Sequence, residues 1–408
     1  MANFVYVYSG RSASGKIVKG RLEAPNETAA TARVRSMGLT PVSIAQSRAG
    51  AGLSMEITIP GFGRGVSLKD LAIMSRQMAT MIAAGLSLLK TLKILADQTE
   101  SKPLGKIIAQ VMVDVESGGS LSDSMTVHAS SFPPVMISLV RVGELGGFLD
   151  RSLETIASNF EAEVKLRATI KSALTYPVIV LVMAVLAVAA MLIFIVPVFK
   201  GLFESLGGTL PLPTQLLVWL SSVMMYVAPV AIGATLAVSV WWRAKRNTEA
   251  VRKVVDPIKL RLPVFGPLFK KLAVARFSRN FSSMIGAGVP ILQALSIVGE
   301  TSGNWVLEDG LKRVADEVRQ GRSIAEPLAA SSVFPTMVTQ MIAVGENAGA
   351  LEQMLGKIAD FYDQEVQSST EQLTSMIEPM MVAFLGLVVG GMIVALYLPI
   401  FSIFNLIK

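Results

Sequence analysis

The sequence contains no cysteine and only one histidine, His128, among 408 residues. The lack of cysteine excludes disulfides, thiolate zinc sites, iron–sulfur clusters and a cysteine nucleophile. A single histidine also excludes imidazole-rich metal sites and most catalysis by a histidine base. His128 has no evident catalytic partner in its segment SMTVHASSFPP, and we expect it on the surface or in a loop.

One segment comes close to a phosphate-binding loop. GRSASGKI, residues 10–17, has the two glycines and the lysine of that pattern, but Ile17 stands where a Ser or Thr would hold magnesium. The following residues alternate as in a strand and do not open a helix whose N-terminus could bind phosphate. We interpret the segment as a hairpin turn. Because the sequence then has no nucleotide-binding loop, no metal-ligand cluster and no credible catalytic base, it predicts no enzyme, no cofactor and no metal site. Basic residues form no stripe interleaved with aromatics, and nucleic acid is not an expected partner.

Charged residues are scarce, at 16% of the chain, whereas 52% of residues are hydrophobic and the mean hydropathy is +0.55. A membrane helix needs about 20 apolar residues. Three charge-free stretches reach that length and predict membrane helices over 172–199, 216–242 and 379–407. The lack of charge inside them argues against a conduction pathway. In the third, Gly386-xxx-Gly390 either lets two membrane helices approach closely or marks loose packing within one chain.

Basic residues set the expected orientation of these helices. One basic cluster ends at Lys171, just before the first predicted membrane helix, and another runs from Arg243 to Lys253, just after the second. Cytoplasmic flanks of membrane helices are rich in Lys and Arg, so the N-terminus and both polar regions are expected in the cytoplasm. The segment 200–215 and the C-terminus are then external.

The chain repeats itself at an offset of 203 residues, which falls to 202 further along. RQMATMIAAGLSLLKTLKIL from Arg76 aligns with RNFSSMIGAGVPILQALSIV from Arg279, and VGELGGFL from Val142 aligns with VGENAGAL from Val344. The matches keep their order over roughly 130 residues per copy, which indicates a true internal repeat. Each copy is a polar helical region that runs into a membrane helix, and the unpaired second membrane helix returns the chain to the same side.

Apolar residues recur at helical spacing in each polar region, and breaks rich in glycine and proline divide each region into about five or six short helices. The first residues alternate like strands around one helical stretch. The predicted fold class is mainly α: a multi-pass membrane protein with two repeated cytoplasmic helical bundles, three transmembrane helices and a small α+β N-terminal module. The predicted parts are a strand-strand-helix-strand module (1–46), a flexible linker (47–65), cytoplasmic helical bundle 1 (66–171), transmembrane helix 1 (172–199), an external loop (200–215), transmembrane helix 2 (216–242), a linker and cytoplasmic helical bundle 2 (243–378) and transmembrane helix 3 (379–407).

The most distinctive polar features are two Gly-Glu pairs at matching positions of the repeat, Gly143-Glu144 and Gly345-Glu346. In a structural interpretation the glycine permits a helix end, and the glutamate caps the next helix or fills a buried hydrogen bond. In a functional interpretation the pairs belong to a docking surface. Pro379 is expected in the first turn of its membrane helix, beside the capping Glu378. Together with the paired turns, the candidate docking or conformational residues are Gly85, Gly143, Glu144, Pro177, Gly288, Gly345, Glu346 and Pro379.

In combination, these features resemble the PilC/GspF family of inner-membrane platform proteins of type IV pilus and type II secretion machines. The resemblance covers essentially the whole chain. It rests on FVYVYSGRSASGKIVKGRLEA at the start, the two R-x(7)-AG segments, the doubled VGE, and EPMMVAFLGLVVGG followed by ALYLPIF at the end. One departure is Ala348 before Gly349, where the first copy has Gly146-Gly147, and we expect the second bundle to turn differently there.

The resemblance implies a non-enzymatic scaffold in the bacterial plasma (inner) membrane. It implies bundles that engage a cytoplasmic hexameric assembly ATPase, membrane helices that contact pilin or pseudopilin subunits, and contacts with other inner-membrane assembly proteins, membrane lipid and further copies in a homo-oligomer. On this interpretation Glu346→Ala weakens ATPase association without blocking insertion. The competing hypothesis is a small-molecule transporter or channel subunit, which a liposome flux assay would reveal.

Overall fold

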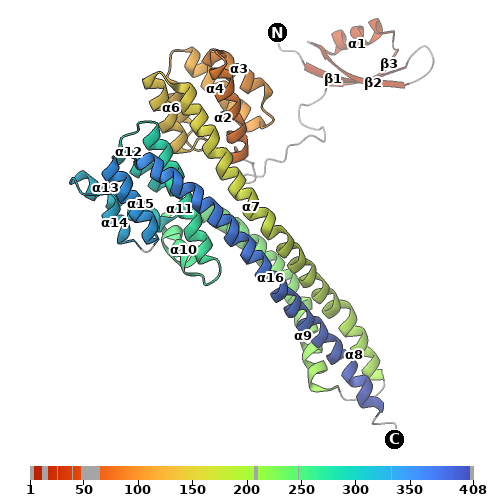
Figure 1. Cartoon of the computed structure of the whole chain (residues 1–408). Helices are drawn as coiled ribbons and strands as arrows, with labels where there is room; N and C mark the ends of the chain where they lie inside the picture. The colour runs from red at the N-terminus through yellow and green to blue at the C-terminus, as the bar shows by residue number, and fades with distance from the viewer. Residues whose placement is uncertain are drawn as a thin grey trace. The chain divides into compact units, whose positions relative to one another are not determined.

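The computed structural model describes residues 4–11, 17–24, 26–38, 40–46, 65–205, 210–246, 248–331 and 333–404 (Figure 1). The chain divides into two units, residues 1–63 and 64–408. The predicted linker, except for its last residue, and residues 12–16 of the segment that is close to a phosphate loop lie outside the described residues.

The N-terminal unit follows the predicted order of strand, strand, helix and strand. It consists of β1 (Phe4–Arg11), β2 (Ile17–Ala24), α1 (Glu27–Ser36) and β3 (Thr40–Gln46). Both neighbours of β1 are antiparallel to it, and the strand order is β2-β1-β3. Arg11 pairs with Ile17, as expected for a hairpin. The side chain of Asn26 caps α1 by accepting a hydrogen bond of 2.8 Å from the Ala29 amide.

The first bundle consists of short helices that end where glycine or proline interrupts the sequence. Ser67 and Asp70 form a capping box at its start, which fixes the first turn. Its helices are α2 (Leu68–Ala83), α3 (Leu88–Gln98), α4 (Lys102–Glu116), α5 (Leu121–Val127), α6 (Pro134–Gly146) and the first half of α7 (Leu149–Ala190).

The second bundle repeats this order after one additional helix, α10 (Glu249–Arg261). The repeated helices are α11 (Gly266–Gly286), α12 (Ile291–Thr301), α13 (Trp305–Arg319), α14 (Ala325–Ala329), α15 (Thr336–Ala348) and the first half of α16 (Leu351–Phe404). The structure therefore confirms the two repeated bundles.

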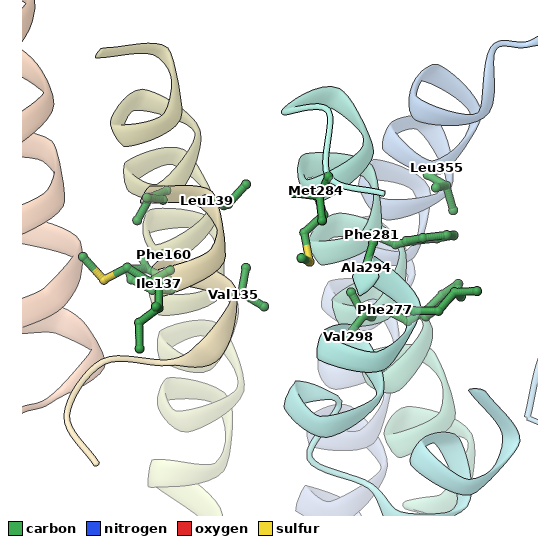
Figure 2. Close-up of a cluster of buried hydrophobic side chains, with 14 of the residues drawn as sticks. Val135, Ile137, Leu139, Phe160, Phe277, Phe281, Met284, Ala294, Val298 and Leu355 are labelled. Carbon is green, nitrogen blue, oxygen red and sulfur yellow. The ribbon is translucent and has the colours of Figure 1, made fainter. Parts of the chain in front are cut away.

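The cores of the two bundles form one continuous hydrophobic cluster. Phe277 packs against Phe281 and edge-on against Phe334, with ring centroids 5.5 and 5.0 Å apart. Val135 lies on the side of α6 that faces the second bundle, where α6 contacts α11 and α12 (Figure 2). Because apolar surface is buried between the bundles as well as inside them, the two bundles are packed against each other.

Three helical stretches are long and apolar enough to cross a membrane, over Leu149–Phe203, Leu212–Lys245 and Leu351–Pro399. The first comprises α7, a π-helical turn η1 (Met191–Ile195) and α8 (Val196–Ser205). The second is α9 (Leu212–Lys245) and the third is α16. The structure therefore agrees with the prediction of three transmembrane helices, on length and composition.

The long helices differ from prediction where bundle and membrane helix meet. Neither α7 nor α16 breaks there, and Pro177 and Pro379 lie inside these helices. The prediction that Pro379 occupies a first helical turn was wrong, because the change from charged to apolar residues at Glu378 does not coincide with a helix end. A single proline removes one amide, which a long apolar helix tolerates. The predicted loop 200–215 is also shorter, because helix continues to Ser205 and resumes at Leu212.

Candidate functional site

The first Gly-Glu pair lies near the end of α6, and its carboxylate binds the start of α5. Glu144 accepts hydrogen bonds from the amides of Leu121 and Ser122 at 2.7 and 3.1 Å, and from the Ser122 hydroxyl at 3.0 Å. A carboxylate is favourable there because the amides at a helix N-terminus lack partners within the helix. Glu144 therefore ties α6 to α5.

The second Gly-Glu pair makes the same connection between α15 and α14. Glu346 accepts hydrogen bonds from the Ser323 hydroxyl at 2.6 Å and from the Ile324 amide at 3.0 Å. These bonds favour the structural interpretation of both glutamates, with one correction. Each carboxylate caps the helix before its own, whereas one of the two structural roles expected from the sequence was a cap on the next helix.

The glycine of each pair allows two helices to approach closely. A Cβ atom on Gly143 would lie 2.6 Å from the Cβ of Ser152 on α7. A Cβ atom on Gly345 would lie 3.0 Å from the Cα of Leu351 on α16. Any larger residue would therefore push α6 away from α7, or α15 away from α16, and the first site is the tighter of the two.

The turns after the two pairs have the same shape. Gly147 and Gly349 are both left-handed, with φ of 74° and 66°, so the predicted difference between the bundles was wrong. Residue 146 is glycine for a separate reason, because a Cβ atom there would overlap the ring of Phe148. The second copy has Ala350 at the position of that ring, which leaves room for Ala348.

Gly85 and Gly288 form a second matched pair of turns. Both are left-handed, with φ of 85° and 79°. In each turn the next amide donates to a carbonyl in the last turn of the preceding helix, at 3.0 and 2.9 Å. These glycines lead α2 into α3 and α11 into α12, and the eight candidate residues are thus distributed over turns and long helices of both copies, not gathered in one pocket.

An ion pair that was not predicted from the sequence recurs in both bundles. Arg76 of α2 reaches Glu154 and Glu161 of α7, at 2.5 and 2.7 Å. Its counterpart Arg279 of α11 reaches Asp363 of α16 at 2.5 Å, and Asp360 at 3.4 Å. The two arginines begin the R-x(7)-AG segments, so their matched positions were the available signal.

The two ion pairs lie in different electrostatic surroundings. All four carboxylates lie in the bundle halves of α7 and α16. Hydrogen bonds from Arg76 lower the pKa of Glu161. Burial raises the pKa of Asp363, although Arg279 opposes that change. The pair in the second bundle is therefore the less hydrated one.

Polar contacts also join the two bundles to each other. Glu163 of α7 accepts from Arg276 of α11 at 2.6 Å, and Asn159 accepts from the hydroxyl of Ser283 at 2.9 Å. Beside these contacts lies a cavity of about 250 Å³ that Arg279 and Asp363 also line. No sequence pattern indicated these pairs, because their members belong to different copies of the repeat.

The unrepeated helix α9 bonds to both of the other membrane helices. Thr214 donates its hydroxyl to the carbonyl of Ala395 on α16, and Ser221 donates to the carbonyl of Leu192 in η1, each at 2.5 Å. The first carbonyl would ordinarily bond the amide of residue 399, which is proline.

The carbonyl of Leu192 lacks a backbone amide partner for an equivalent reason. In η1 the amide of Val196 bonds the carbonyl of Met191, so the amide for Leu192 would come from residue 197, which is also proline. The prolines at 197 and 399 match in the repeat, in VPVF and LPIF. Two hydroxyls of α9 therefore satisfy carbonyls that equivalent prolines leave without an amide.

Within the described residues, no group of three or more His, Cys, Asp or Glu side chains is placed to hold a metal ion. The polar groups described above bond to other parts of the chain, and they connect helices. These features define a class: a multi-pass membrane protein built from a duplicated unit, a helical bundle that continues into a membrane helix.

Comparisons with known proteins show the family. The profile of the family described as type II secretion system (T2SS), protein F matches residues 74–197 and 277–399, one segment in each copy. The profile of the N-terminal domain of the same protein matches residues 1–45. The chain belongs to this PilC/GspF family, as its sequence suggested.

Named relatives match over nearly the full length. The type IV pilus assembly protein PilC of Myxococcus xanthus is 42% identical over 99% of this chain and 96% of its own length. PilC of Thermus thermophilus is 42% identical over 98% of both chains. Type II secretion system protein F of Pseudomonas aeruginosa is 31% identical over the whole of both chains.

Proposed function

We propose that this protein is a non-enzymatic inner-membrane platform of a type IV pilus or type II secretion assembly machine. It couples a cytoplasmic hexameric assembly ATPase to the polymerisation of pilin or pseudopilin subunits. The observation that carries the proposal is the full-length similarity to proteins named for pilus assembly and for type II secretion. The higher identity to the pilus proteins favours the pilus branch.

The long helices suggest how such coupling works. In α16 one continuous helix of 54 residues contributes to the second bundle and also carries the third membrane helix. In the first copy, α7 with η1 and α8 does the same. A force applied to a bundle would therefore reach the membrane through an unbroken helix, without a flexible joint.

The proposed orientation places the N-terminus and both bundles in the cytoplasm and the C-terminus outside. The basic clusters beside the first two membrane helices support it. A homo-oligomer is part of the proposal: a Cβ atom on Gly386 or Gly390 would meet nothing within 4 Å, so this small-residue face is not packed within the described chain. Lipid and other inner-membrane assembly proteins complete the set of proposed partners.

The turns that carry Glu144 and Glu346 remain our candidates for a site where the ATPase docks, or for a site that controls the conformation of the docking bundle. The glutamates bond within the chain, but Leu145 beside the first is 84% exposed. Direct docking predicts that Leu145→Ser reduces ATPase co-purification without loss of bundle stability. Conformational control through the capped helices predicts that Glu346→Ala reduces both ATPase co-purification and bundle stability.

Deletion of the gene tests the proposed function directly. Surface filaments, or secreted substrate, should be lost in the deletion strain and restored by the wild-type gene. The purified protein in liposomes should carry no small-molecule flux. Normal filaments and secretion after deletion would overturn the proposal.

A further inference from the structure

The segment that follows the second membrane helix concentrates positive charge. Residues 241–264 contain seven Lys or Arg and two Asp or Glu, whereas the whole chain has a net charge of +7. One of the two acids, Asp256, is buried and occupied: it pairs with Lys259 at 2.9 Å and accepts the Trp305 amide at 2.9 Å. Arg252 also forms an ion pair, with Glu308 at 3.0 Å, and the segment still has an excess of basic side chains.

The same segment exposes an apolar ridge. Helix α10 buries Asp256 and Leu260 against the second bundle. Val254 and Ile258 are 61% and 56% exposed. At about 100° per residue, they lie on the opposite side of the helix from the buried face. Leu262 and Val264 continue the exposed apolar surface beyond its end.

A cavity of about 450 Å³ lies between the end of α9 and α10. Its wall is formed by apolar, basic and acidic side chains, among them Trp242, Arg246 and Lys259 together with the carboxylates of Asp256 and Glu300. Arg246 makes no ion pair within the part of the chain that the structure describes. The exposed indole of Trp241 adjoins this end of the membrane helix. Tryptophan beside basic residues at the end of such a helix is typical of the lipid headgroup level.

We propose that the end of α9 and the outer face of α10 bind an anionic phospholipid of the cytoplasmic leaflet. Arg246 binds its phosphate at the cavity, next to the pair of Lys259 with Asp256, and the ridge of Val254 and Ile258 enters the acyl boundary beside it. An apolar ridge flanked by lysine and arginine is the pattern of a helix lying at a membrane surface. The inference rests on α9 crossing the membrane and does not require the proposed assembly role.

The test measures lipid binding to the full-length protein in detergent by native mass spectrometry. The probes are phosphatidylglycerol and phosphatidylcholine with the same acyl chains. Wild-type protein should bind phosphatidylglycerol more tightly, and Arg246→Gln should weaken that binding about fivefold, the effect of one basic residue near an anionic surface. Arg151→Gln, at an exposed arginine on the first bundle, is the matched control and should change nothing.

A second pair of variants tests the ridge. Ile258→Asn should weaken binding of both lipids, whereas Ile73→Asn, at an isoleucine 47% exposed on α2, should weaken neither. The melting temperature of each variant checks that its fold is intact. We expect intact folds, because the substituted residues are exposed. Equal affinity of the wild type for both lipids, equal effects of Arg246→Gln and Arg151→Gln, or full displacement of phosphatidylglycerol by soluble glycerol phosphate would each overturn the proposal.

Discussion

At the scale of single residues, the two copies of the repeat share particular side-chain contacts as well as the same order of helices. The glutamate after each close-packed glycine caps a neighbouring short helix in both copies. Helices as short as α5 and α14 are not stable alone, so an anchored N-terminus contributes much of what holds them in place.

Removal of either cap should therefore loosen its bundle. Glu144→Ala and Glu346→Ala should each lower the free energy of unfolding by about 2 kcal/mol, because partly buried amides lose a charged acceptor. Thermal melting of the purified protein followed by circular dichroism measures this. Asn347→Ala, at an exposed neighbour, is the control and should be nearly neutral. A cap variant that melts like the control would contradict the capping role.

The two equivalent ion pairs should differ in strength and in response to acid. At neutral pH, Arg76→Gln should cost about 1 kcal/mol because the pair is well exposed. Arg279→Gln should cost about 2 kcal/mol because it leaves a more buried carboxylate unpaired.

Linkage between proton binding and folding gives the pH dependence. The lowered pKa of Glu161 means that the first pair stabilises the fold above the unfolded pKa, and that this stability is lost as pH falls through the folded pKa. The raised pKa of Asp363 means that the folded state binds its proton more tightly than the unfolded state does. Arg279 lowers that pKa, so Arg279→Gln should raise it further. As the pH falls, the stability difference between Arg279→Gln and the wild type should therefore disappear at a higher pH than the difference for Arg76→Gln. Melting curves across an acid series measure both, and closure in the reverse order would refute this assignment.

At the scale of elements, α9 has a role that its lack of a repeat partner did not reveal. Its hydroxyls at Thr214 and Ser221 lie on one face, seven residues apart, and reach the two membrane helices of the repeat. Both side chains are buried. We infer that α9 holds the pair of repeated membrane helices at their matching prolines.

A double-mutant cycle tests this directly. Thr214→Val should destabilise the protein by about 1 kcal/mol, because the carbonyl of Ala395 then lacks a donor in an apolar setting. Thr214→Ser should be nearly neutral. Pro399→Ala restores an amide, so it should suppress most of the effect of Thr214→Val. Unfolding in mixed micelles gives the four free energies, and additivity of the two substitutions would be evidence against the bond.

Sequence patterns predicted the elements whose causes are local. Glycines at 85 and 288 marked left-handed turns because few other residues adopt that conformation. The charge-free runs marked the membrane helices because hydrocarbon excludes charge. The unbroken course of α16 through Pro379 was missed, since proline and a charge boundary together also fit a helix start. The contact of Glu163 with Arg276 was beyond prediction, because it depends on how the two bundles pack against each other.

At the scale of the whole molecule, the residues that looked most functional in sequence hold helices together. The second unit is two bundles with a shared core, and two of its three membrane helices are direct extensions of bundle helices. This arrangement suits a protein that transmits movement from the bundles on one side of a membrane to the helices inside the membrane, which is the proposed platform role.

The proposed platform role depends above all on the stiffness of α16 between the bundle and the membrane. Glu371 and Gln372 are exposed residues just before the membrane part of this helix. Their replacement by Gly-Gly should weaken the helix locally by about 2 kcal/mol, whereas Ala-Ala removes the same side chains without that loss. The most direct measurement is the number of surface filaments, or the amount of secreted substrate, in cells that carry each variant at equal membrane levels. If a stiff α16 transmits the force, assembly should be lost with Gly-Gly and nearly normal with Ala-Ala, and ATPase co-purification should be normal with both. Normal assembly with Gly-Gly would show that this stiffness is not required.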